Sequence, residues 1–189
     1  WHTRGYLPHF DQAGLLQSLT FRLADSLPAA VLDRMHDDAQ IANDQQRMRQ
    51  IEVQLDACLG ECYLRLPAVA SLVQTTLLHS DGRHYKLMAW VIMPNHVHAV
   101  VEVFEEYSLS EVVQAWKSYT AHGANKMLHR TGAFWAIEYF DRFIRDASHY
   151  DRVVQYIHQN PVKAGLVMNA EEWPFSSAYK SGAQASSPA

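Results

Sequence analysis

The strongest β-forming stretch lies in the middle of the chain, over residues 90–103, where only Pro94 and Asn95 interrupt a run rich in valine and isoleucine. Proline cannot donate a hydrogen bond to a neighbouring strand, and asparagine favours turns, so this pair predicts a tight turn or kink. We therefore expect an antiparallel hairpin, with one strand over residues 83–93 and the next over residues 96–103.

Elsewhere in the chain, the spacing of apolar residues predicts the remaining strands and helices. Residues 132–144 are rich in aromatic side chains but have no regular spacing, so we expect them to be irregular. Trp173 and Phe175 are expected to pack the C-terminal segment onto the rest of the protein. The other predicted elements are a strand over 15–23, a long helix over 28–59, and shorter helices over 67–78, 109–128 and 148–160.

Two of these helices carry recognisable start or stop signals. Ser108 and Glu111 have the spacing of a capping box, in which each side chain bonds the other residue's backbone N–H. Ser148 and Asp151 form a variant of the same box. Pro161 is expected to end the last helix, because the residue before a proline is driven out of the α region.

Strands and helices mix without strict alternation, which favours an α+β fold. We expect a small antiparallel sheet with helices on one face, which would leave the other face open to a ligand. The long helical stretch near residues 28–59 is an addition to this plan. We assign residues 1–165 to one domain with a helical insertion at about 28–66, and residues 166–189 to a C-terminal tail.

The composition is that of a globular protein, since 48% of the 189 residues are hydrophobic and 19% are charged. No apolar run approaches the ~20 residues that span a bilayer, and no secretory signal is visible. Cys58 and Cys62 are the two cysteines and are spaced i, i+4, which favours packed thiols over metal ligands or a disulfide. These features predict a cytoplasmic protein.

The net charge of −4 argues mildly against a nucleic-acid partner, but the charge is unevenly distributed. Residues 1–111 hold 8 Lys and Arg against 14 Asp and Glu, whereas residues 112–189 hold 8 against 6. A surface that faces DNA is therefore expected in the second part. The candidate phosphate contacts, for which a plain solvated surface is the alternative, are Lys117, Lys126, Arg142 and Arg145.

His96 and His98 are two residues apart on a predicted strand, so both side chains should lie on the same face and Val97 on the other. Their Cα atoms would be about 6.5–7 Å apart. Two imidazoles at this spacing can bind one cation, with metal–nitrogen bonds of roughly 2.0–2.2 Å. The alternative is a pair of polar surface residues or hydrogen-bonded core residues.

Tyr156 lies about a quarter-turn from the apolar face of the last predicted helix. Asn160 is four residues further on and lies almost above it. The ordinary interpretation is a tyrosine at the edge of a packing face, and the alternative is a reactive hydroxyl. His149 and His158 are candidate bases for such a hydroxyl. The apolar face itself consists of Tyr150, Val153, Val154 and Ile157.

Four motifs, in this order, resemble the REP-associated tyrosine transposases of the single-tyrosine HUH nuclease superfamily. They are MPNHVH, KSYTAHGANK, FWAIEYFDRFIRD and YIHQNPVKAGLV. The resemblance covers roughly residues 4–179. It implies a ferredoxin-like core and the cutting and joining of single-stranded DNA at hairpins in a bacterial, nucleoid-associated setting. The helical stretch near 28–59 departs from shorter members of the family.

The resemblance also implies the roles of individual residues. Tyr156 would be the nucleophile that forms a 5′-phosphotyrosine, and His96, His98 and Asn160 would hold Mg²⁺ or Mn²⁺. A free phenol has a pKa near 10, so it needs a metal or a base to help remove its proton. Two alternatives remain: a non-catalytic protein that binds DNA or RNA hairpins, and a metal-dependent hydrolase that uses water. Monomer and homodimer are both open.

Overall fold

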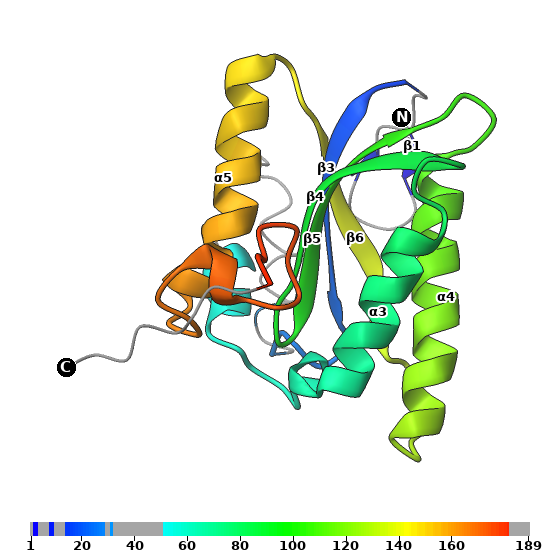
Figure 1. The fold of residues 1–189 in the computed structure, drawn as a ribbon. Helices are drawn as coiled ribbons and strands as arrows, with labels where there is room; N and C mark the ends of the chain where they lie inside the picture. The colour runs from blue at the N-terminus through cyan, green and yellow to red at the C-terminus, as the bar shows by residue number, and fades with distance from the viewer. Residues whose placement is uncertain (1, 4–7, 10–13, 29–30, 32–50, 182–189) are drawn as a thin grey trace.

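The computed structural model describes residues 2–3, 8–9, 14–28, 31 and 51–181 (Figure 1). Among the described helices, none is long and apolar enough to cross a bilayer. The short elements are the paired strands β1 (His2–Thr3) and β2 (Pro8–His9) and the 3₁₀ helices η2 (Tyr63–Arg65) and η3 (Ala170–Glu172).

Four strands of the described residues form one antiparallel sheet in the order β4-β5-β3-β6. With two helices the chain runs β3-α3-β4-β5-α4-β6, and the first strand of this series lies in the interior of the sheet. This is the ferredoxin-like arrangement, so the expected α+β fold is confirmed. The bounds are β3 (Leu16–Leu23), α3 (Pro67–His79), β4 (Tyr85–Ile92), β5 (His96–Val103), α4 (Leu109–Met127), β6 (Trp135–Phe143) and α5 (Ala147–Lys163).

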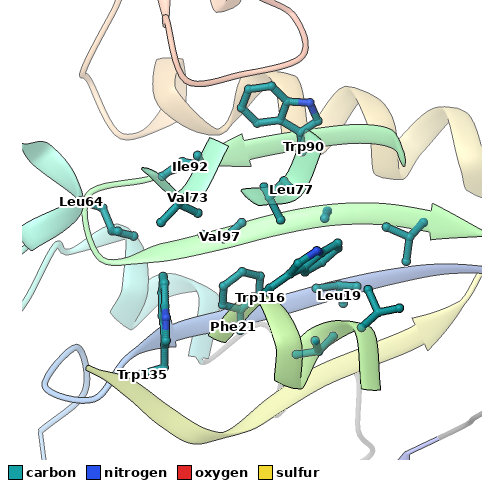
Figure 2. Packing of buried hydrophobic residues seen from close by; sticks show 14 of the residues in the cluster. Leu19, Phe21, Leu64, Val73, Leu77, Trp90, Ile92, Val97, Trp116 and Trp135 are labelled. Atoms are coloured by element: carbon teal, nitrogen blue, oxygen red, sulfur yellow. The ribbon is translucent and has the colours of Figure 1, made fainter. Parts of the chain in front are cut away.

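Helices α3 and α4 cover one face of the sheet, and the main hydrophobic core lies between them and the strands (Figures 1 and 2). On β5, Val97 and Ala99 point into this core, as the two-residue period requires. Phe21 of β3 packs edge-on against Trp135 with ring centroids 4.8 Å apart. The capping box of Ser108 begins α4 as predicted.

Buried polar groups in this core are paired with one another. The Nε1–H of Trp116 donates to the hydroxyl of Tyr85 over 2.9 Å, and that hydroxyl donates to the carbonyl of Leu77 over 2.6 Å. The chain of two bonds joins α4, β4 and α3. Trp135 of β6 donates in the same way to the hydroxyl of Thr120 on α4, over 2.8 Å.

Helix α5 lies on the opposite face of the sheet, which differs from the expectation that the helices share one face (Figure 1). Its residue Ile157 is buried with Val91 of β4 and Val100 of β5. The reason is that β4 and β5 are apolar on both sides, and the apolar face of α5 needs a partner. Trp173 packs here, and Phe175 packs against the main core, as expected.

Residues 132–144, which we expected to be irregular, contain strand β6. The strand pairs with β3. Its aromatic residues point to both faces of the sheet, since Trp135 packs in the main core and Phe140 packs on the other side with Leu55. Because both faces are partly covered, the sequence lacks the apolar–polar alternation by which a strand is recognised.

The limits of α5 also differ from the prediction. Asp146, not Ser148, caps the helix, since its carboxylate accepts from the N–H of His149 over 2.7 Å. The helix passes through Pro161 and ends at Lys163, with Gly165 in the left-handed conformation (φ 68°). A proline removes one helical hydrogen bond, and here Pro161 is buried, so packing offsets part of that loss.

Most of the long helix that we expected over residues 28–59 lies outside the described residues. Residues 51–56 are helical, and Cys58 with φ 50° marks the end of that helix. Ile51 and Leu55 pack with Phe140 of β6, so this segment lies on the same face of the sheet as α5.

Candidate active site

The site begins at the turn between β4 and β5, which Pro94 and Asn95 form as predicted. The N–H of Met93 donates to the carbonyl of His96 over 2.8 Å and closes the turn. The carbonyls of Pro94 and Asn95 accept from Leu64 and Leu23, at 3.2 and 2.8 Å. These three hydrogen bonds hold the turn in place and fix the start of β5.

His96 and His98 lie on the α5 face of β5, with exposed fractions of 0% and 4%. Their Nε2 atoms are 3.0 Å apart, and their rings are nearly perpendicular, at 82°. Two nitrogens that bind one ion at right angles, with bonds of about 2.1 Å, would be about 3 Å apart. The predicted shared face is confirmed, and the spacing fits a common cation.

The outer nitrogens of both rings, the Nδ1 atoms that point away from the facing Nε2 pair, are held by hydrogen bonds. Asn95 donates its Nδ2 hydrogens to the carbonyls of Leu55 and Leu59, so its Oδ1 is free to accept from the Nδ1–H of His96 over 2.7 Å. His98 Nδ1 shares a hydrogen bond of 2.7 Å with the hydroxyl of Thr20. The Nε2 lone pair of His96 is thereby directed at His98. Such outer bonds orient the ligands of metal sites.

Burial lowers the pKa of both histidines, and His98 lowers that of His96 further. The pKa of His98 falls to about 3. Both imidazoles are consequently neutral at physiological pH, which is the form that binds metal ions.

Helix α5 places Tyr156 against His98, with ring centroids 5.4 Å apart at 77°. The hydroxyl of Tyr156 is buried and makes no hydrogen bond of normal geometry among the described residues, although Asn160 and Glu52 lie near enough to affect its pKa, and neither amide atom of Asn160 makes one. Leaving a buried polar group unpaired costs about 1–3 kcal/mol, so such groups call for an explanation. A ligand bound beside them would supply the missing partners.

Burial raises the pKa of Tyr156 well above its usual value, and the carboxylates of Glu52 and Asp56 raise it further. The phenol is therefore protonated at neutral pH and needs a cation nearby to become a nucleophile. Glu52 and Asp56 were not predicted as site residues, although their i, i+4 spacing places them on one helical face.

The donor set fits a divalent ion: two neutral imidazole nitrogens that point at each other and an unpaired amide oxygen on Asn160. Within the described residues, no three His, Cys, Asp and Glu side chains gather as a metal site. The amide oxygen of Asn160 is a further candidate donor.

The two candidate bases lie away from the Tyr156 hydroxyl. His149 is seven residues earlier on α5, or about 10 Å along the axis, and accepts from the N–H of Arg145 over 3.2 Å. His158 shares a hydrogen bond of 3.0 Å with Ser177 in the C-terminal segment. We therefore expect neither to take the phenol's proton.

The predicted DNA contacts form two groups. Arg142 and Arg145 are exposed near the start of α5. The pKa of His149 is lowered mainly by burial, and the charges of these two arginines lower it further. Lys117 and Lys126 lie on α4, across the sheet from the histidines. Lys117 donates to the carbonyl of Ile137 over 2.7 Å. The structure thus brings together His96, His98 and Tyr156, with Asn160 one helical turn beyond Tyr156 on α5, but it does not bring the basic residues to them.

Comparison with known proteins agrees with this arrangement. Residues 72–160 match the family described as Transposase IS200 like. The chain is 29% identical over 100 residues to a REP-associated tyrosine transposase of Escherichia coli (strain K12). That match covers 52% of this chain and 57% of the relative, so less than two thirds of the relative is spanned.

A solved structure of a REP-associated tyrosine transposase bound to a REP hairpin has the same fold. Its TM-score is 0.56 at 19% identity, over 90% of this chain and 80% of that one. The predicted resemblance to REP-associated tyrosine transposases is confirmed.

Proposed function

We propose that this protein is a DNA-processing transposase that cuts and joins single-stranded DNA beside a hairpin. The observation that carries the proposal is the facing pair of His96 and His98, with the unpartnered hydroxyl of Tyr156 packed against it. The Escherichia coli relative is named a transposase, and the solved neighbour holds a REP hairpin, which supports hairpin DNA as the substrate class. Such DNA would be met in the bacterial cytoplasm, at the nucleoid.

In this proposal, His96, His98 and Asn160 hold Mg²⁺ or Mn²⁺. When bound, the ion would polarise the attacked phosphate and hold it in line. Hydrogen bonds from Asn95 and Thr20 orient both imidazoles, which supports a pair of proposed ligands that is arranged before DNA binds. The helix turn between Tyr156 and Asn160 keeps the hydroxyl beside the ligands.

Tyr156 then attacks the phosphorus of the scissile phosphate. A bond forms between the phenol oxygen and the phosphorus, the phenol proton passes to solvent, and the bond to the 3′ oxygen of the preceding nucleotide breaks. That oxygen takes up a proton and leaves as a free 3′-OH. The product is a 5′-phosphotyrosine, which conserves the energy of the ester for rejoining. The polarity of cleavage follows from the family resemblance.

The test is incubation with hairpin-bearing single-stranded oligonucleotides and Mn²⁺, read on a denaturing gel. We expect a protein–DNA adduct from the wild type, and none from Tyr156→Phe or after chelation of the metal. His96→Ala and His98→Ala should also abolish the adduct, and Asn160→Ala should weaken it less, since water can replace one oxygen ligand. Cleavage without any adduct would favour a hydrolase that uses water, and hairpin binding without cleavage would favour a non-catalytic binding protein.

A further inference from the structure

Lys163 closes helix α5 and shares a face with the proposed nucleophile. It follows Tyr156 by seven residues and Asn160 by three, so at 100° per residue the three side chains lie within an arc of about 60°. Its Nζ atom lies 4.6 Å from the centre of the Tyr156 ring. A positive charge therefore lies over the ring of the tyrosine that would attack a phosphate.

An anion already lies close to this ammonium. Burial raises the pKa of Asp56, and the neighbouring charge of Lys163 partly lowers it again. The Oδ1 atom of Asp56 is buried and has no hydrogen-bond partner among the described residues. The space beside Tyr156 thus contains a cation and several unpaired polar atoms, and a phosphate that contacts Lys163 would take the place of Asp56 as the partner of this ammonium.

We propose that Lys163 is a further catalytic residue, whose ammonium contacts a non-bridging oxygen of the phosphate that Tyr156 attacks. The inference rests on the proposed function and extends it to a residue outside the matched segment 72–160. Negative charge builds on these oxygens as the new ester forms, and a positioned cation stabilises it. Lysine suits this role because its flexible stem carries a compact charge with three donors.

A structural role for Lys163 must be separated from this one. A cation in the last turn of a helix is stabilised by the partial negative charge of the carbonyl end. That effect would change the stability of α5 in any variant without the charge, but it would not act on cleavage separately from stability. The test therefore needs cleavage, binding and melting to be measured on the same variants.

The experiment measures adduct formation under single-turnover conditions, with excess protein, a labelled hairpin oligonucleotide and Mn²⁺. We expect Lys163→Gln to slow the reaction about 100- to 1000-fold, while Lys163→Arg stays within a few-fold of wild type because it keeps the charge. Hairpin affinity and melting temperature should stay close to those of wild type. Lys86→Gln, which changes an exposed lysine on β4, serves as the matched control and should have no effect.

Wild-type rates in Lys163→Gln would overturn the inference. If Lys163→Gln is slow and its melting temperature is also clearly lower than that of wild type, Lys163 has a structural role, and the inference is overturned as well. An equally slow Lys163→Arg would show that charge is not what matters. These outcomes all presuppose an adduct in the wild type; if the wild type forms none, the proposed function itself fails.

Discussion

At the scale of single residues, the direction of the two imidazoles depends on what holds their outer nitrogens. Asn95 is completely buried, and both polar atoms of its side chain are hydrogen-bonded. Its Nδ2 group donates to the carbonyls of Leu55 and Leu59, and its Oδ1 accepts from His96. The residue links the segment that ends helix 51–56 to the proposed metal ligands. Its side chain therefore decides whether His96 is oriented before a metal binds.

Asn95→Ala should weaken Mn²⁺ binding about 10- to 100-fold, as is usual when the outer partner of a histidine ligand is removed. Calorimetric titration with Mn²⁺ measures this directly. Asn169→Ala is the control, because Asn169 bonds Glu172 at η3 in a separate part of the fold. Unchanged affinity in Asn95→Ala would mean that His96 is not held through this bond or is not a ligand.

Lys117 gives a second test at this scale. Burial lowers its pKa to about 8, while Glu138 acts in the opposite direction. Between pH 8 and about 10.4, the unfolded chain keeps this proton and the folded chain has lost it. The free energy of unfolding should therefore rise with pH in this window on account of Lys117. Urea unfolding at pH 7.5 and 9.5 should show a larger rise for wild type than for Lys117→Met; an equal rise would contradict the shift.

The sequence predicts the residues of the site whose relation is local. The two-residue period of a strand places His96 beside His98, and the helical turn places Asn160 above Tyr156. It did not reveal Glu52, Asp56 or Thr20, since their closeness to the site depends on how distant segments pack. Lys163 was within reach of the same helical reasoning, at seven residues from Tyr156.

At the scale of elements, recognition succeeded where a strong local signal was present, which was the valine-rich run around Pro94 and Asn95 in the hairpin and the helical spacing of apolar residues in α3 and α4. The hairpin, α3 and α4 lie close to their predicted bounds. Strand β6 was missed because Trp135 and Phe140 serve opposite faces. The end of α5 was placed too early because Pro161 is tolerated inside a helix that buries it. Both errors arise where tertiary contacts override a local preference.

The hydrogen-bonded chain from Trp116 through Tyr85 to Leu77 ties α4, β4 and α3 together. Tyr85→Phe would leave the Nε1–H of Trp116 buried without an acceptor, which should cost about 1–3 kcal/mol of unfolding free energy. Urea unfolding measures the loss. Tyr119→Phe, at a side chain that is 65% exposed, should change little. A Tyr85→Phe protein as stable as wild type would contradict this account of the core.

At the scale of the whole molecule, a ferredoxin-like sheet is enclosed by α3 and α4 on one face and by α5 with residues 51–56 on the other (Figure 1). The fold class could be predicted from the mixture of elements. The helix that covers the second face could not be predicted, because the sequence of a strand that is apolar on both sides does not indicate which helix will pack on it.

The overall charge of −4 limits how many phosphates the protein can neutralise. We expect tighter binding to hairpin-bearing single strands than to plain duplex, through about 3–5 phosphate contacts. The logarithm of the affinity should then fall with the logarithm of salt concentration with a slope of about −2 to −3.5. Fluorescence anisotropy at several salt concentrations measures both. Equal affinity for hairpin and duplex at matched salt would contradict the expected preference.

The central claim is that Tyr156 forms a covalent bond with the 5′-phosphate of the cut strand. Trypsin cleaves after Arg152 and Lys163, so Tyr156 is the one tyrosine of the peptide 153–163, and Tyr150 falls on another peptide. Mass spectrometry of the nuclease-trimmed adduct should find the added nucleotide on peptide 153–163, with a free 3′-OH on the released fragment. A nucleotide on any other peptide, or a 3′-linked adduct, would contradict the account.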